Sequence, residues 1–185
     1  MNLVNIRRKF LAILTLTAAL LLGACAGEQQ SAPMAVLSRE AVMEADGRMC
    51  GVEYAARVTV GGAPDGGSRD LCVVYSAPDA LAGLTVRREG GVWGAELGPV
   101  TVSGDAARLL ALPAELFLLT GEVVFTGTES GPDGAKNAVF TLSGSEGSAR
   151  ITLCGEVPVA ASVTFADGRE VTMNVRAYSP AGAEN

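Results

Sequence analysis

The stretch "VTFADGREVTMNV", Val163 to Val175, carries the clearest pattern in this 185-residue sequence. Apolar and polar residues alternate on both sides of the dipeptide Asp167-Gly168. Alternation with a period of two is typical of a β-strand with one buried face, and Asp-Gly readily forms the tight turn that joins two such strands. We therefore predict a β-hairpin here, as part of an antiparallel sheet.

The same alternation recurs along the chain. In "VEYAARVTV", Val52 to Val60, every second residue is apolar, which predicts a strand with one solvent-facing side. An antiparallel sheet of about ten such strands is too wide to stay flat, so we expect it to curve into a half-barrel. The predicted strands are Val52–Val60, Leu71–Ser76, Leu84–Arg88, Val92–Leu97, Val100–Ser103, Glu122–Gly127, Ala138–Ser143, Ala149–Cys154, Ala161–Phe165 and Glu170–Ala177.

Two segments depart from this pattern and are predicted to be helical. The first runs from Val36 to Asp46 and has its apolar residues near one helical face. The second runs from Ser103 to Glu122, and Asp105 is expected to cap its helix. Pro113 then ends this helix, kinks it, or begins a second helix. Leucines occur on nearly all sides of this second helical segment, so it has no polar face and must be covered by other apolar groups. The predicted fold is mainly β (α+β), with both helical segments covering the concave face of the sheet.

The N-terminus has the features of an export signal. Three basic residues precede an apolar run, Phe10 to Leu22, that is shorter than the roughly 20 residues of a membrane-spanning helix. The following Leu22-Gly23-Ala24-Cys25 resembles the lipobox of bacterial lipoproteins, in which the cysteine thiol receives a diacylglyceryl group and becomes the new N-terminus. The alternative is an ordinary signal peptide cut near Ala24.

This resemblance implies an exported protein held at the extracytoplasmic face of a bacterial membrane through acyl chains on Cys25. Residues 1–24 are then the signal peptide and residues 25–33 the acylated cysteine and a flexible tether. Residues 34–178 are predicted to form a single domain, and residues 179–185 a disordered tail.

The charge of the chain excludes one class of partner. Loss of the three basic residues of the signal peptide changes the net charge from −6 to −9. Nucleic acids and anionic lipid head groups both need a basic surface, so we expect neither as an electrostatic partner. The sequence identifies no protein partner.

The sequence shows no arrangement typical of an enzyme. It contains no histidine, which removes the commonest general base and metal ligand, and it has no nucleophile or phosphate-binding motif. We predict a non-enzymatic protein without cofactor or metal. For Cys50, Cys72 and Cys154, one disulfide and three buried thiols remain open as alternatives, and a metal site is the least favoured.

The order of elements resembles the superfamily of the lipoprotein carrier LolA, the receptor LolB and the lipoprotein LppX. The stretch "VVYSAPDALAGLTVRREGGVWGAELG", Val73 to Gly98, is similar to that family's strand, proline-containing turn, strand, Gly-Gly turn and next strand. The resemblance implies an incomplete β-barrel with helices over an apolar cavity. It also implies a hydrophobic ligand, either a lipid or an acyl chain.

The candidate ligand-binding residues lie on the apolar helical segment and on the strand face expected below it. The segment is either a lid over a pocket or ordinary core packing. With a packed core, the alternative function is an envelope protein-interaction or sensor module. Trp93 either lines the pocket or packs on the edge or surface of the sheet. The candidates are Leu109, Leu110, Leu116, Phe117, Val58, Val60 and Tyr75.

Overall fold

The computed structural model describes residues 34–62, 68–132 and 134–181. The predicted signal peptide, the lipidation site Cys25 and the tether lie outside the described residues, as does most of the predicted tail. Within the described ranges, no helix is both long enough and apolar enough to cross a membrane.

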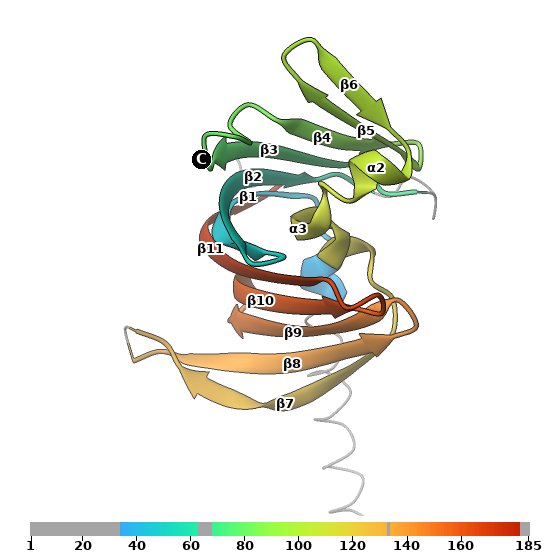
Figure 1. Cartoon of the computed structure of the whole chain (residues 1–185). Coiled ribbons are helices and arrows are strands. Elements are labelled where there is room, and N and C mark those ends of the chain that lie inside the picture. The colour runs from blue at the N-terminus through green and yellow to red at the C-terminus, as the bar shows by residue number, and fades with distance from the viewer. Residues whose placement is uncertain (1–33, 63–67, 133, 182–185) are drawn as a thin grey trace, which may run out of the picture.

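Eleven strands form one antiparallel sheet that curves but does not close (Figure 1). The prediction of a mainly β fold built on a curved antiparallel sheet is confirmed, with one strand more than expected. The strands are β1 Ala41–Met49, β2 Val52–Val60, β3 Leu71–Ala77, β4 Thr85–Glu89, β5 Val92–Leu97, β6 Val100–Ser103, β7 Glu122–Ser130, β8 Lys136–Gly144, β9 Gly147–Cys154, β10 Val157–Phe165 and β11 Glu170–Pro180.

Strands β1 and β11 meet at the centre of this sheet, whose spatial order is β6-β5-β4-β3-β2-β1-β11-β10-β9-β8-β7. Consecutive strands β6 and β7 therefore lie at opposite edges, and residues 104–121 must cross the sheet. Ten steps of about 4.8 Å make an arc of about 48 Å. A connection that is partly helical spans less distance than an extended chain of the same number of residues. Residues 104–121 can therefore join the two edges because the sheet curves and brings them closer together.

The crossover lies inside the curve of the sheet, where Figure 1 shows α2 and α3. It contains α2 (Asp105–Arg108), α3 (Leu112–Glu115) and a 3₁₀ turn, η2 (Leu116–Leu118). Pro113 stands in the first turn of α3, where a missing N–H is harmless, so it begins a second helix. Asp105 is not the predicted cap: the cap position is Gly104, and no side chain caps α2.

Strand β1 corrects the prediction of a helix from Val36 to Asp46. Only residues 34–38 are helical, and Ala41–Met49 is extended. Ala41, Met43 and Ala45 alternate into the core, and β1 is hydrogen-bonded to β2 on one side and β11 on the other. The residues of β1 favour a helix, but strand pairing outweighs this preference. If β1 were helical, the backbone groups of β2 and β11 that face it would have no hydrogen-bond partners.

Gly47 lets β1 and β11 approach closely at the centre of the sheet. A Cβ atom at this position would lie 1.8 Å from the backbone oxygen of Thr172. Tyr54 lies opposite Gly47 on β2, and its hydroxyl donates a hydrogen bond to the same oxygen over 3.2 Å. The glycine and the tyrosine together join three strands.

The helical turn 34–38 is fastened at the end of the sheet where β1 begins. The Arg69 guanidinium donates hydrogen bonds to the backbone oxygens of Leu37 and Ser38, which are carbonyls that a short helix leaves unpaired. Arg39 forms an ion pair of 2.6 Å with Glu156, in the β9–β10 turn.

Strand β11 is longer than predicted. It pairs with β1 as far as Pro180, so residues 179–180 belong to the sheet and not to a disordered tail. The N–H of Ala181 adds a hydrogen bond of 2.8 Å to the backbone oxygen of Glu40. The prediction was wrong here because the pairing that orders these residues comes from the other end of the chain.

Candidate functional site

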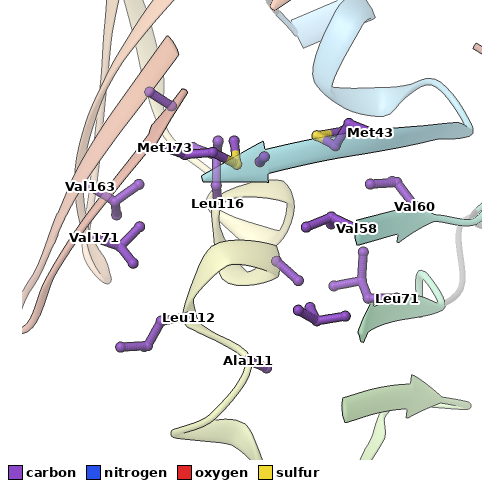
Figure 2. Close-up of a cluster of buried hydrophobic side chains, with 14 of the residues drawn as sticks. Met43, Val58, Val60, Leu71, Ala111, Leu112, Leu116, Val163, Val171 and Met173 are labelled. Atoms are coloured by element: carbon purple, nitrogen blue, oxygen red, sulfur yellow. The ribbon is translucent and has the colours of Figure 1, made fainter. Parts of the chain in front are cut away.

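Buried leucines of the crossover fill the centre of the half-barrel. Leu112 and Leu116 are nearly inaccessible, with exposed fractions of 1% and 2%. Figure 2 shows them between side chains from both halves of the sheet, with Val58 and Val60 on one side and Val163 and Val171 on the other. The crossover therefore closes the interior and belongs to the core.

The predicted ligand-binding residues fall into three environments. Val58, Val60, Tyr75 and Leu116 are buried in the core, while Leu110 and Phe117 are half-buried against it. Leu109 is different, because 53% of its surface is exposed. Of these candidates, Leu109 is thus the one that presents a large apolar surface to an incoming ligand.

Leu109 lies in an apolar groove of about 500 Å³, which we call the rim groove. The groove is formed at the end of the sheet where β1 turns into β2, and it lies between this turn, the loop after β3 and the crossover. Its volume is within the range of small-molecule sites. The described residues that line it are Met49, Cys50, Val52, Pro78, Ala80, Leu81, Leu109, Leu112 and Arg169.

Sequence reasoning missed most of this groove. The alternation in β2 predicts that Val52 faces the core, but 52% of its surface is exposed at the start of the strand, where it lines the groove with Leu109. Pro78, Leu81 and Arg169 lie in turns, where no periodic pattern marks a binding surface. The one available signal was an excess of apolar residues in turns.

Of the described residues that line the rim groove, Arg169 alone carries a charge. Its Nε is 2.6 Å from Oδ2 of Asp167, and its guanidinium lies 5.2 Å from the centre of the Phe165 ring. Its Nη1 is buried and has no hydrogen-bond partner in the described structure. Hydrogen bonds from the backbone N–H of Arg169 and then from its guanidinium lower the pKa of Asp167.

A second ion pair holds the crossover together. Glu115 is a buried carboxylate, 2% exposed, and Arg108 reaches it with Nε at 2.8 Å and Nη2 at 3.4 Å. Nη2 also lies 3.7 Å from Glu146 in the β8–β9 turn. The hydrogen bond to Glu115 raises the pKa of Arg108. This pair links α2, α3 and the far half of the sheet, and its carboxylate is too enclosed to serve as a ligand-facing group.

Tyr75 connects the sheet to the crossover. Its hydroxyl donates a hydrogen bond of 2.6 Å to the backbone oxygen of Leu110, and its ring meets Tyr54 edge to face at 6.1 Å. Burial, followed by the neighbouring Tyr54, raises the pKa of Tyr75. Burial, followed by the charge of Asp46, raises the pKa of Tyr54.

Alkaline pH is therefore expected to destabilise the fold. Above the ordinary tyrosine pKa of about 10, the unfolded chain releases protons that the folded chain keeps, so the free energy of unfolding falls as the pH rises. Each buried tyrosine contributes a slope of about 1.4 kcal/mol per pH unit, and its effect is absent below pH 10. Urea unfolding between pH 8 and pH 11 measures the slope. Tyr75→Phe should reduce the slope above pH 10 by about 1.4 kcal/mol per pH unit. An unchanged slope would show that the fold does not raise the pKa of Tyr75.

The cysteines differ from both favoured predictions. Cys50, Cys72 and Cys154 are free thiols, so they form no disulfide with one another. Nor are they all buried: Cys50 is exposed and the other two are half-buried. In the part of the chain that the structure describes, no group of three potential ligands could hold a metal ion. Trp93 lies on β5, beside the edge strand β6, where it is 7% exposed and packs in the core, with the Arg88 guanidinium 5.9 Å from its ring.

No protein-family model matches the sequence, and a search of curated proteins finds no match. Solved structures do resemble the fold. An uncharacterized conserved protein from Thermus thermophilus superposes with a TM-score of 0.55 at 15% identity, over 86% of this chain and 90% of that chain. MucB, a protein of Pseudomonas aeruginosa, superposes with a TM-score of 0.50 at 12% identity, over 85% of this chain and 61% of MucB.

At such identities the similarity shows a shared fold alone. LppX from Mycobacterium tuberculosis, one of the proteins that the predicted order of elements resembles, also matches over 83% of this chain and 96% of that chain, at 13% identity. Its TM-score of 0.42 is too low to carry an argument. The structures from Thermus thermophilus and of MucB therefore share the overall fold of this chain.

Proposed function

We propose that this protein is a bacterial envelope lipoprotein of LolA-like fold that binds an apolar ligand in the rim groove. The observation that carries the proposal is the concentration of exposed apolar surface there, above all Leu109 and Val52, beside a core that is already filled. Soluble domains rarely leave such a surface uncovered without a use for it. The role is one of binding, without catalysis.

The position of the groove agrees with an anchor on Cys25. The helical turn 34–38, to which the predicted tether leads, lies at the start of β1, and the groove lies at its end. The nine residues of β1 span about 30 Å. In our proposal the groove opens away from the anchored end, toward a ligand delivered by another carrier or another membrane.

Replacement of Leu109 by aspartate tests the groove. We expect the affinity for an uncharged fluorescent probe, such as N-phenyl-1-naphthylamine, to fall about tenfold or more, because a charge replaces a large apolar contact. The measurement is a fluorescence titration of the full chain carrying Cys25→Ser. Stability should change little, since Leu109 is 53% exposed.

Val124→Asp is the matched control, because Val124 is also exposed, at 43%, but lies on β7 outside the groove. It should leave the affinity unchanged. Alkylation of Cys50, which lines the groove, should be slowed by the bound probe. An equal loss of affinity in Leu109→Asp and Val124→Asp would argue against the groove as the site. So would an alkylation rate of Cys50 that the bound probe does not change.

A second candidate function is protein interaction, and the edge strand β6 favours it. All four of its residues are exposed, including Val100 at 59% and Val102 at 39%. The opposite edge, β7, carries Glu122 and Glu129 and a bulge at Phe125–Gly127, which are features that discourage strand addition. A protein without affinity for apolar probes, whose β6 edge pairs with an extended peptide, would fit this alternative.

A further inference from the structure

Arg169 is the charged residue among the described residues that line the rim groove, and one nitrogen of its guanidinium lacks a hydrogen-bond partner in the described structure. A guanidinium has five N–H donors in a planar fork. For Arg169, Asp167 accepts from Nε, at one side of the fork, and the buried Nη1 has no acceptor in the described structure. A buried donor without a partner lowers stability, so an acceptor that reached it would be bound favourably.

The geometry points to an amphiphile with an acyl chain and an anionic head group, a carboxylate or a phosphate, whose head group Arg169 binds and whose chain lies along the groove. This assignment rests on the proposed function and names its ligand class. The chain-facing residues, among them Leu81 and Leu109, offer only apolar surface, whereas the guanidinium matches a two-oxygen anion.

The environment of Arg169 explains why it can take such a head group. Its side chain is 24% exposed, so one part of it reaches solvent while the rest is enclosed. The ring of Phe165 supports the guanidinium from one face. Asp167 is exposed and orients the side chain through Nε, leaving the terminal nitrogens for a second acceptor. An uncharged apolar ligand would leave Nη1 without a hydrogen-bond acceptor.

A matched pair of probes tests the head group. We use cis-parinaric acid and its methyl ester, which share one chain, with the full protein carrying Cys25→Ser at pH 8, where a carboxylate is ionised. The acid should bind about tenfold or more tightly than the ester, because a charge-assisted hydrogen bond is lost in the ester. Arg169→Met should lower the affinity for the acid to that for the ester, and Arg169→Lys should restore part of the difference.

Asp167→Asn separates the head-group role from a structural role in the turn. It removes the ion pair of Arg169 but keeps the guanidinium, so the acid should bind at least as tightly as before. Competition by palmitate against hexadecyl phosphate then distinguishes a carboxylate from a phosphate source.

The outcomes separate this assignment from the proposed function. Equal binding of acid and ester, or equal losses of affinity in Arg169→Met and Asp167→Asn, would overturn the head-group assignment while the groove remained a ligand site. Failure of both probes to bind would overturn the groove itself as a ligand site, and the assignment with it.

Discussion

Replacing Gly47 by alanine is expected to lower the free energy of unfolding by about 3 kcal/mol or more. The added Cβ would lie 1.8 Å from the backbone oxygen of Thr172 and 3.1 Å from the Cα of Met173. Both atoms belong to the backbone of β11, so no flexible side chain can move aside. The strands would have to separate where β1 and β11 join the two halves of the sheet. Urea denaturation followed by far-UV circular dichroism measures the effect.

Gly94→Ala is the control for this prediction. Gly94 also lies within a strand, β5, but a Cβ there would meet no heavy atom within 4 Å. Both substitutions change strand propensity alike, so their difference isolates the close approach at Gly47. We expect Gly94→Ala to change the free energy of unfolding by less than about 0.5 kcal/mol. Similar losses in the two variants would mean that the contact with β11 does not limit residue 47.

Replacing Arg108 by methionine is expected to destabilise the fold by about 2–3 kcal/mol. The substitution leaves the carboxylate of Glu115 buried, at 2% exposure, without its partner. The expected loss of stability is smaller than for a fully buried ion pair, because the side chain of Arg108 is 40% exposed. Thermal and urea unfolding report the change. We also expect α2 and α3 to loosen together, which hydrogen exchange of the crossover would show.

Two further variants decide whether the buried charge is the cause. Adding Glu115→Gln to Arg108→Met removes the unpaired charge and should recover part of the lost stability. Arg150→Met breaks an exposed ion pair with Glu129, whose side chains are 56% and 41% exposed, and should cost less than about 1 kcal/mol. If Arg150→Met were as damaging as Arg108→Met, burial of the carboxylate would not explain the loss.

The strands were predictable wherever one strand face is buried and the other is wet. β2 and β5 have the predicted boundaries, and β11 begins where expected after Asp167-Gly168. β6 also has the predicted boundaries, although all four of its residues are exposed. β1 escaped prediction because its composition favours a helix, with alanine, methionine and glutamate close together. Its conformation is determined by the partners on either side, and neither partner is visible in a local window of sequence.

The candidate site was predictable only in part. The crossover was correctly marked as apolar, but a sequence window cannot tell which of its leucines faces the core. Leu116 is buried and Leu109 is exposed, and this difference depends on the break between α2 and α3 and on the sheet around the crossover. The head-group residue proposed here, Arg169, gave no signal because an arginine in a turn is ordinary.

The sequence by itself determined the properties that arise between near neighbours in the chain. Alternation over a few residues specifies a strand and Asp-Gly a turn, because each depends on local backbone geometry. Pro113 marks an interruption of the helical segment in the sequence, and the structure shows that it begins a second helix. The tertiary structure alone decided the pairing of β1 with β11, the path of the crossover and the rim groove. These features join residues more than a hundred positions apart, such as Cys50 and Glu170, whose backbones share a hydrogen bond of 2.9 Å. Such contacts form only when the whole sheet curves around its core, so no local pattern encodes them.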